Sequence, residues 1–390
     1  MKNKSIIKTN FDTEKKASLE NWRTSPICKW AFHHVREIVP SAEIPNDPKT
    51  LWSLNYQSTS LDAEGLLTLI KETSTDAIVI IHENNVIFES YHNGMNSNDQ
   101  HILFSVSKSI LGLIAGCLIY KSILKETDLI SKYVPEIIGT AYHNATIRNA
   151  LDMRVGVQFR EDYTAQYGPM IDYRYASNWN LTPETKMSLT IKSFLTSLKE
   201  SDGCHGRNFH YVSPNTDLLA WVFERASGLR YNDLISHYLL KPIGSERSAY
   251  ITLDRMGGMR AAGGICMTAR DLARVGMLIY QNGKKDQKQI IPTDWIADFF
   301  KPMKYSIWNK GTFSDFFNGK KMHYRSNWYI ENNIAQLVFG FGIHGQHLFI
   351  DPYRKMSIAW LSSHKNPLDK EATNRILNMV DLIRNSVHPV

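Results

Sequence analysis

Two apolar runs near residue 80 predict a β-hairpin. Residues 77–81 and 86–91 are rich in β-branched and apolar side chains, and the polar turn sequence 83–85 separates them. The next apolar run, 110–119, combines small and apolar residues and predicts a buried helix that begins near Ser105. Because a bilayer span needs about 20 apolar residues, this run is too short to cross a membrane.

Helical patterns dominate the middle of the chain, from 146 to 282. Ser213 followed by Pro214 is typical of a helix start, with the serine as N-cap and the proline as first helical residue. Thr268 with Asp271 predicts the start of another helix, which runs to residue 280. This segment is therefore expected to form a mostly helical block.

Short β-rich runs return near the C-terminus, at 338–342, 347–350 and 356–362, and a helix is expected over 370–385. The turn between the last two runs is too short for a parallel crossover, so we expect antiparallel strands. The order of elements predicts an α/β (α+β) fold, in which an antiparallel sheet is flanked by helices and carries an inserted helical subdomain. The expected parts are 1–145, 146–282 and 283–390, with the first and last sharing one sheet.

Composition narrows the class of protein. The 390 residues are 43% hydrophobic and 21% charged, as in ordinary globular proteins, and the polar start favours a cytoplasmic location because it lacks a signal-peptide core. The net charge of +7 comes from scattered short basic pairs, so neither a nucleic acid nor a membrane surface is the expected partner. Four dispersed cysteines without C-x-x-C spacing argue against disulfides and a zinc site.

The tetrapeptide Ser-x-x-Lys occurs at Ser5, Ser105, Ser122 and Ser362. Only Ser105 directly precedes the predicted buried helix, where a serine in the first turn feels the positive end of the helix dipole. Residues three apart share one helix face, so Lys108 can place its amine beside the Ser105 hydroxyl, as acyl transfer requires. The alternative is an ordinary N-cap serine with a solvated lysine.

Two further elements follow in order along the chain. Tyr211 stands just before the helix predicted to begin at Pro214. The run Gly340-Phe341-Gly342-Ile343-His344-Gly345 formally matches G-x-G-x-x-G, yet a strand rather than a helix follows it, which excludes a dinucleotide site. We interpret these glycines as positions where substrate approaches the strand backbone closely.

Longer segments resemble the serine β-lactamase-like (penicillin-recognising) hydrolases, and within them the 6-aminohexanoate-dimer (nylon-oligomer) hydrolases and related carboxylesterases. The matching segments are 29–32, 39–42, 105–109, 213–217, 219–221, 228–231, 263–264, 268–276 and 342–346. The resemblance implies that Ser105 is the nucleophile, Lys108 its activating neighbour and Tyr211 the general base and acid. It also implies an oxyanion hole formed by the backbone N–H groups of Ser105 and Ile343.

The same resemblance implies a set of substrate-binding residues: Tyr163, Arg174, Trp179, Ser213, Ala262 and His344. Departures from the family pattern narrow the substrate. Gly340-Phe341-Gly342 replaces the Lys-Thr-Gly of β-lactamases, so penicillin hydrolysis is not expected. Ala262 replaces an expected asparagine, and Arg174 stands where an acidic residue would meet a substrate amine. A guanidinium at that position repels an ammonium group.

We therefore predict a serine hydrolase that cleaves an amide or ester bond of a small molecule at a site between the two parts of the fold. No metal or organic cofactor is expected, and the protein acts as a monomer or homodimer. One alternative is a carboxylesterase that uses the same residues on small acyl esters. Another is a non-catalytic protein that uses the same cleft for binding.

Overall fold

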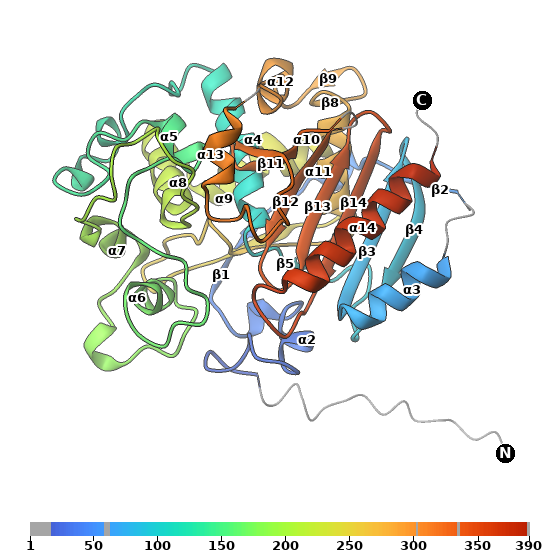
Figure 1. The fold of residues 1–390 in the computed structure, drawn as a ribbon, viewed down its shortest axis with the longest axis horizontal. Coiled ribbons are helices and arrows are strands. Elements are labelled where there is room, and N and C mark those ends of the chain that lie inside the picture. Colours follow the sequence, from blue (N-terminus) through green and yellow to red (C-terminus); the bar gives the residue numbers. More distant parts are fainter. Residues whose placement is uncertain (1–16, 58–62, 302, 334–335, 388–390) are drawn as a thin grey trace.

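A large sheet built from both ends of the chain organises the fold (Figure 1). The computed structural model describes residues 17–57, 63–301, 303–333 and 336–387. In spatial order the strands are β10 (Met322–Arg325), β11 (Trp328–Glu331), β12 (Leu337–Gly342), β13 (Gln346–Asp351), β14 (Met356–Ser362), β3 (Thr75–His82), β4 (Asn85–Tyr91) and β2 (Asn55–Tyr56). All neighbours pair antiparallel except β2 and β4. The pairing of β14 with β3 confirms that the two ends of the chain share one sheet.

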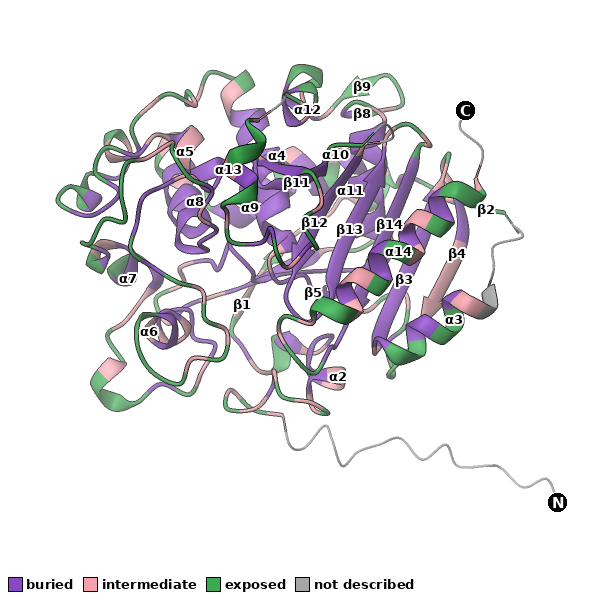
Figure 2. Ribbon diagram, in the orientation of Figure 1, coloured by how far each residue is buried: buried purple, intermediate pink, exposed green. Residues whose placement is uncertain are grey.

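Alternation along the strands gives the large sheet two apolar faces. In β3, Val79 and Ile81 join one hydrophobic cluster, whereas Ile78 and Ile80 join another. Helices α3 (Ala63–Glu72) and α14 (Lys370–Ser386) cover one face, and α11 (Ala269–Tyr280) packs against β3, β13 and β14. Figure 2 shows the result, with buried strands beneath an α14 that is exposed on its outer side.

The middle of the chain forms mainly helices together with a second, smaller sheet. Besides α11, its α-helices are α5 (Ile147–Leu151), α6 (Pro169–Ala176), α7 (Ile191–Ser197), α8 (Pro214–Ser227), α9 (Tyr231–Ile235) and α10 (Lys241–Ile243). The small sheet has the order β1 (Ser41–Ile44), β6 (Ala249–Thr252), β7 (Ile265–Met267) and β5 (His101–Ile102). Outside this region lie α2 (Cys28–Ala31), α12 (Thr293–Phe299), α13 (Tyr305–Asn309) and the ribbon of β8 (Lys284–Lys285) with β9 (Lys288–Gln289). The strands β6 and β7 interrupt a segment whose pattern predicts helix.

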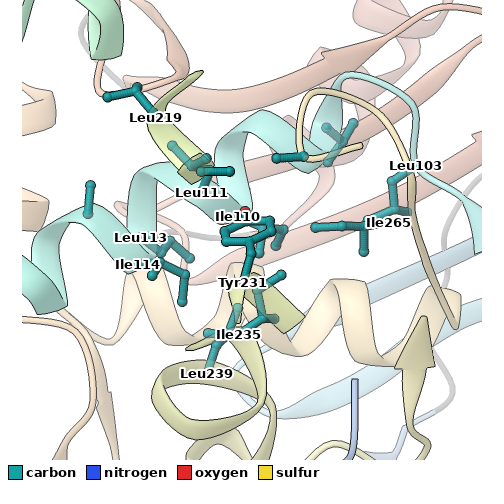
Figure 3. Close-up of a cluster of buried hydrophobic side chains, with 14 of the residues drawn as sticks. Leu103, Ile110, Leu111, Leu113, Ile114, Leu219, Tyr231, Ile235, Leu239 and Ile265 are labelled. Carbon is teal, nitrogen blue, oxygen red and sulfur yellow. The ribbon is translucent and has the colours of Figure 1, made fainter. Parts of the chain in front are cut away.

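Helix α4 (Val106–Tyr120) runs through the middle of the molecule. Its side chains from Val106 to Leu118 are buried, and Figure 3 shows Ile110 and Ile114 beside Tyr231 and Ile235 of α9. Gly112 allows a close approach, because a Cβ there would lie 2.1 Å from the carbonyl oxygen of Ser326. Within the described ranges, no helix combines the length and hydropathy needed to cross a bilayer.

Most of the predicted elements are confirmed. The hairpin of β3 and β4, the three late strands and α14 lie where the pattern places them. Helix α11 begins after Thr268, whose side chain accepts a hydrogen bond from the backbone N–H of Asp271. Helix α8 begins at Pro214 as expected, but the Ser213 side chain forms no capping hydrogen bond. The boundaries at 145 and 282 stay predictions, and α11, which falls inside the middle part, packs on the large sheet.

The four cysteines and three of the four Ser-x-x-Lys sequences lie among the described residues. Cys28, Cys117, Cys204 and Cys266 are all free thiols. Ser122 lies in the turn that follows α4, with a φ of +57°. Ser362 is the last residue of β14, and Ser5 lies outside the described residues. Ser105 alone occupies the start of the buried helix α4.

Candidate active site

The hydroxyl of Ser105 is held by Lys108 at the start of α4. Ser105 is the N-cap residue, yet its side chain caps no backbone N–H. Lys108 lies one helical turn further on, and its Nζ donates to Ser105 Oγ at 2.7 Å and to the Ala262 carbonyl oxygen at 2.8 Å. Phe104 precedes the serine with a φ of +42°, which is unusual for a bulky residue and typical of strained functional sites. Together these contacts fix the hydroxyl at the point where the chain turns into the helix.

Burial changes the acid–base behaviour of Lys108. Its side chain is only 1% exposed, and this burial lowers the pKa of the amine to about 7. Glu161 and Asp217 oppose the lowering by favouring the ammonium form, whereas the charge of Arg260 adds to it. Near neutral pH, a large fraction of Lys108 is therefore an unprotonated amine that can accept a proton.

Tyr211 lies on the other side of the lysine, in the segment that leads into α8. Lys108 Nζ is 5.0 Å from the centroid of the tyrosine ring, which is buried against the rings of Phe313, Tyr324 and Tyr329. Burial, and secondarily the charge of Glu161, raise the pKa of Tyr211, while a hydrogen bond with Ser105 acts in the opposite direction. The phenol is thus protonated at rest, with its hydroxyl hydrogen-bonded to Ser105 and its ring beside the Lys108 amine.

The end of β12 lies against the first turn of α4. A Cβ on Gly342 would lie 2.7 Å from the Leu103 carbonyl oxygen and 3.0 Å from the Ser105 backbone nitrogen. This approach brings Ile343 to the serine. Within the described chain, the backbone N–H groups of Ser105 and Ile343 donate to no other protein group.

The glycines of β12 serve a different purpose from the one expected. A Cβ on Gly340 would lie 2.9 Å from Ser109 Oγ and 3.1 Å from Val106 Cγ1, both on α4. The interpretation that Gly340 and Gly342 admit substrate to the strand is therefore wrong. Both residues make room for the helix that carries the serine, because a side chain would push β12 away from it.

A small cavity opens beside Ser105. Its lining brings together seven residues that the sequence points to: Ser105, Tyr163, Arg174, Trp179, Ser213, Ala262 and Ile343. His344 is not among the lining residues. Its ring packs against Phe32 and Phe104, its Nδ1 lies 2.7 Å from the His364 carbonyl oxygen, and burial lowers its pKa to about 3. The structure thus assigns His344 to the core behind the site, which corrects its expected place among the substrate contacts.

A buried ion pair holds the turn that receives Lys108. Asp217 Oδ1, on α8, accepts from the backbone N–H of Ala262 at 2.8 Å. Its Oδ2 accepts from the Tyr173 hydroxyl at 2.6 Å and forms an ion pair with Arg260. Since the carbonyl of Ala262 is a lysine acceptor, Asp217 positions Lys108 through the backbone of this turn.

Comparison of the chain with known proteins identifies its family. The beta-lactamase family model matches residues 68–380. The chain belongs to the beta-lactamase family. The 6-aminohexanoate-dimer hydrolase of Paenarthrobacter ureafaciens is 33% identical over 356 residues, which make up 90% of this chain and 89% of that enzyme. The protein is accordingly a member of a family of serine hydrolases.

Solved structures of other proteins share the fold. A Bacillus anthracis protein assigned as a 6-aminohexanoate-dimer hydrolase has a TM-score of 0.87 at 25% identity, over 96% of this chain and 97% of the other. The octameric penicillin-binding protein homologue from Pyrococcus abyssi has a TM-score of 0.62 at 18% identity, over 82% and 78% of the two chains. These similarities confirm the predicted fold class.

Three charged residues of this beta-lactamase-family site carry no signal in the sequence. Glu161 accepts hydrogen bonds from the Tyr163 hydroxyl and the Ser213 backbone N–H. Arg23 and Arg260 line the cavity. All three lie in irregular segments, so neither a periodic pattern nor a short motif points to them. Within the described ranges, no group of three or more His, Cys, Asp or Glu residues could hold a metal ion.

Proposed function

We propose that this protein hydrolyses an amide or ester bond through an acyl-enzyme on Ser105. The observation that carries the proposal is the 2.7 Å contact between Ser105 Oγ and a buried Lys108 whose pKa is about 7. A buried amine with a pKa near the working pH is suited to general base catalysis. Membership of the beta-lactamase family supports the same chemistry.

In the proposed acylation step, Ser105 Oγ attacks the carbonyl carbon while its proton passes to Lys108. Tyr211 donates a proton to the leaving nitrogen or oxygen, and Lys108 returns one to the phenol. The backbone N–H groups of Ser105 and Ile343 donate hydrogen bonds to the negatively charged carbonyl oxygen, and each donor contributes a few kcal/mol. These two donors support this role because no acceptor from the described part of the chain occupies them.

In the proposed deacylation step, the same groups act on water. The Lys108–Tyr211 pair takes one proton from the water that attacks the acyl carbon, and Ser105 Oγ leaves with a proton. The products are a carboxylic acid and the free serine. Apart from the substrate and this water, both proposed steps use only groups of the chain itself.

A matched ester and amide test the proposal. We expect hydrolysis of p-nitrophenyl butanoate, and slower hydrolysis of butanoyl p-nitroanilide, to fall about a thousandfold or more in Ser105→Ala. Ser122→Ala is the matched control, because Ser122 begins the same Ser-x-x-Lys pattern but lies in the turn after α4. Equal activity in Ser105→Ala would overturn the proposal, whereas turnover of the ester alone would define a carboxylesterase.

A further inference from the structure

Two arginines beside the candidate nucleophile have no acidic partner among the residues that the structure describes. Arg23, Arg174 and Arg260 all line the cavity that contains Ser105. Arg260 is paired with Asp217. Within the described part of the chain, Arg23 and Arg174 form no ion pair, and their acceptors are neutral oxygens.

Those neutral contacts use only part of each guanidinium. Arg23 donates to the Trp179 carbonyl oxygen at 3.3 Å and to the Asn180 side chain, and Arg174 donates to the Tyr163 carbonyl oxygen at 2.7 Å. The Nε atoms of both arginines are buried and have no hydrogen-bond partner in the described ranges. A guanidinium has five N–H donors in a planar fork, so each arginine keeps donors that suit a bidentate anion.

The surrounding charges make the arrangement unfavourable without such an anion. Burial, followed by the charges of Arg174 and Arg260, lowers the pKa of Arg23 to about 9. Burial also lowers the pKa of Arg174; Tyr163 and the exposed Asp162 oppose this lowering, and Arg260 adds to it. An anion between the two guanidiniums would reduce their desolvation cost and their mutual repulsion.

The acidic groups of the site are already engaged elsewhere. Asp217 holds Arg260 and the backbone of Ala262. Glu161 accepts from Tyr163 and Ser213, and it favours the ammonium form of Lys108. The positive charge of Arg23 and Arg174 therefore remains available to a ligand in the cavity.

We propose that Arg23 and Arg174 form an anion-binding subsite, and that the substrate is an ester or amide with a carboxylate near the scissile carbonyl. This inference rests on the proposed hydrolase function. A carboxylate matches the planar guanidinium fork, and both arginines line the cavity that contains Ser105. The carboxylate takes no part in bond making, so the products are the free acid and the alcohol or amine. The same two charges disfavour a substrate with an ammonium group in this position.

Matched p-nitrophenyl esters test the subsite on the acyl side. Three chains of equal length can end in a methyl, a carboxylate or a trimethylammonium group: the pentanoate, the glutarate monoester and the 4-trimethylammoniobutanoate. After subtraction of spontaneous hydrolysis, we expect kcat/KM to be about tenfold to a hundredfold higher for the glutarate than for the pentanoate. The cationic ester should be the poorest substrate. A second pair, phenyl pentanoate and its 4-carboxyphenyl analogue, places the carboxylate on the leaving group instead.

Variants separate the subsite from general electrostatics. Arg174→Gln should remove most of the preference for the anionic ester while hydrolysis of the neutral ester changes much less, and Arg174→Lys should retain part of the preference. Arg375→Gln is the matched control, because Arg375 lies on α14, across the large sheet from α4, in an exposed ion pair with Glu72. It removes one positive charge and should leave the preference unchanged. An equal loss in Arg375→Gln would contradict a local subsite.

Binding to Ser105→Ala separates failure of the subsite from failure of the hydrolase proposal. By calorimetry, glutaric acid monoamide should bind this variant about tenfold or more tighter than pentanamide, and Arg174→Gln should abolish the difference. Ser105-dependent hydrolysis without any anion preference or binding would overturn the subsite alone. Anion binding without hydrolysis would overturn the hydrolase and, with it, the assignment of the anion to a substrate.

Discussion

Lys108 is an amine that the protein has removed almost completely from water. Its hydrogen-bond acceptors are Ser105 Oγ and the carbonyl oxygen of Ala262, both uncharged. The ammonium form is therefore poorly compensated, which is why its pKa falls from an ordinary 10.5 to about 7. The neutral amine is the form that can remove a proton from the serine.

The pH dependence of activity should reflect this titration. If neutral Lys108 is the base, kcat/KM for a neutral ester rises about tenfold per pH unit below pH 7 and levels off above it. A pH–rate profile with p-nitrophenyl butanoate measures this. A profile that stays flat between pH 5 and 8 would contradict the role of the lysine.

Stability provides a second readout of the same group. Because the folded-state pKa of Lys108 is lowered, the unfolded state binds more protons between about pH 7 and 10.5. The wild-type protein should therefore gain stability relative to Lys108→Met as pH rises through this window, by an amount on the order of a few kcal/mol. Urea unfolding of both proteins at pH 6 and pH 9 measures the difference, and an unchanged difference would show that the amine is not buried as described.

At the level of single residues, sequence predicts what is local. Ser105 and Lys108 are three apart on one helix, so their contact follows from helical geometry. Three other residues reach the site only because irregular segments pack against it: Glu161, Arg23 and Arg260. The periodicity of the sequence does not predict such packing. His344 is expected from the sequence to contact substrate, but its ring packs in the core. The motif does not predict the direction in which the ring points.

The junction between α8 and the turn at 260–263 shows how elements position the site. Asp217 of α8 joins Arg260 and the backbone N–H of Ala262, so the helix determines where the Ala262 carbonyl oxygen stands. That oxygen in turn receives Lys108. The carboxylate of Asp217 therefore connects α8 to the carbonyl group that holds Lys108.

Asp217→Asn tests this junction. Loss of the charge leaves Arg260 buried without its partner, which typically costs about 3–5 kcal/mol, and it should also lower kcat because the Lys108 acceptor is no longer fixed. Asp233→Asn, an exposed acid on α9, is the control and should change stability by less than about 0.5 kcal/mol. Denaturant unfolding and ester kinetics on both variants provide the comparison. A loss of stability in Asp217→Asn with no change in kcat would limit Asp217 to a structural role.

At the level of helices and strands, elements with long apolar runs can be predicted from the sequence, whereas very short strands cannot. The strands β3, β12 and β14 contain clear apolar runs, and they lie where those runs predict. The strands of the small sheet have two to four residues, too few for alternation to show. Likewise, only the packing of α4 against β12 reveals why residues 340 and 342 are glycines.

At the level of the whole molecule, one hydrophobic cluster joins the helical part to the large sheet. It includes Ile110 and Leu113 of α4, Leu218 of α8, Leu272 of α11 and Val79 of β3. Such a shared core does not favour independent unfolding of the two parts, although they are distinct in topology. The candidate nucleophile lies where they meet, at the start of α4.

This core predicts a single unfolding transition. Far-UV circular dichroism, which follows mainly the helices, and the fluorescence of the nine tryptophans should give the same midpoint in urea. Two separated transitions would instead support independent units near the predicted boundaries at 145 and 282. Coincident transitions at different protein concentrations would also show that the midpoint does not depend on assembly.

The central claim is that Ser105 is the residue that becomes acylated, and covalent labelling tests it most directly. After treatment with a fluorophosphonate, peptide mass spectrometry should find one adduct, on Ser105, and none in Ser105→Ala. Labelling should also decrease below pH 7, since Lys108 is then protonated. An adduct on another serine, or full labelling of Ser105→Ala, would contradict the account.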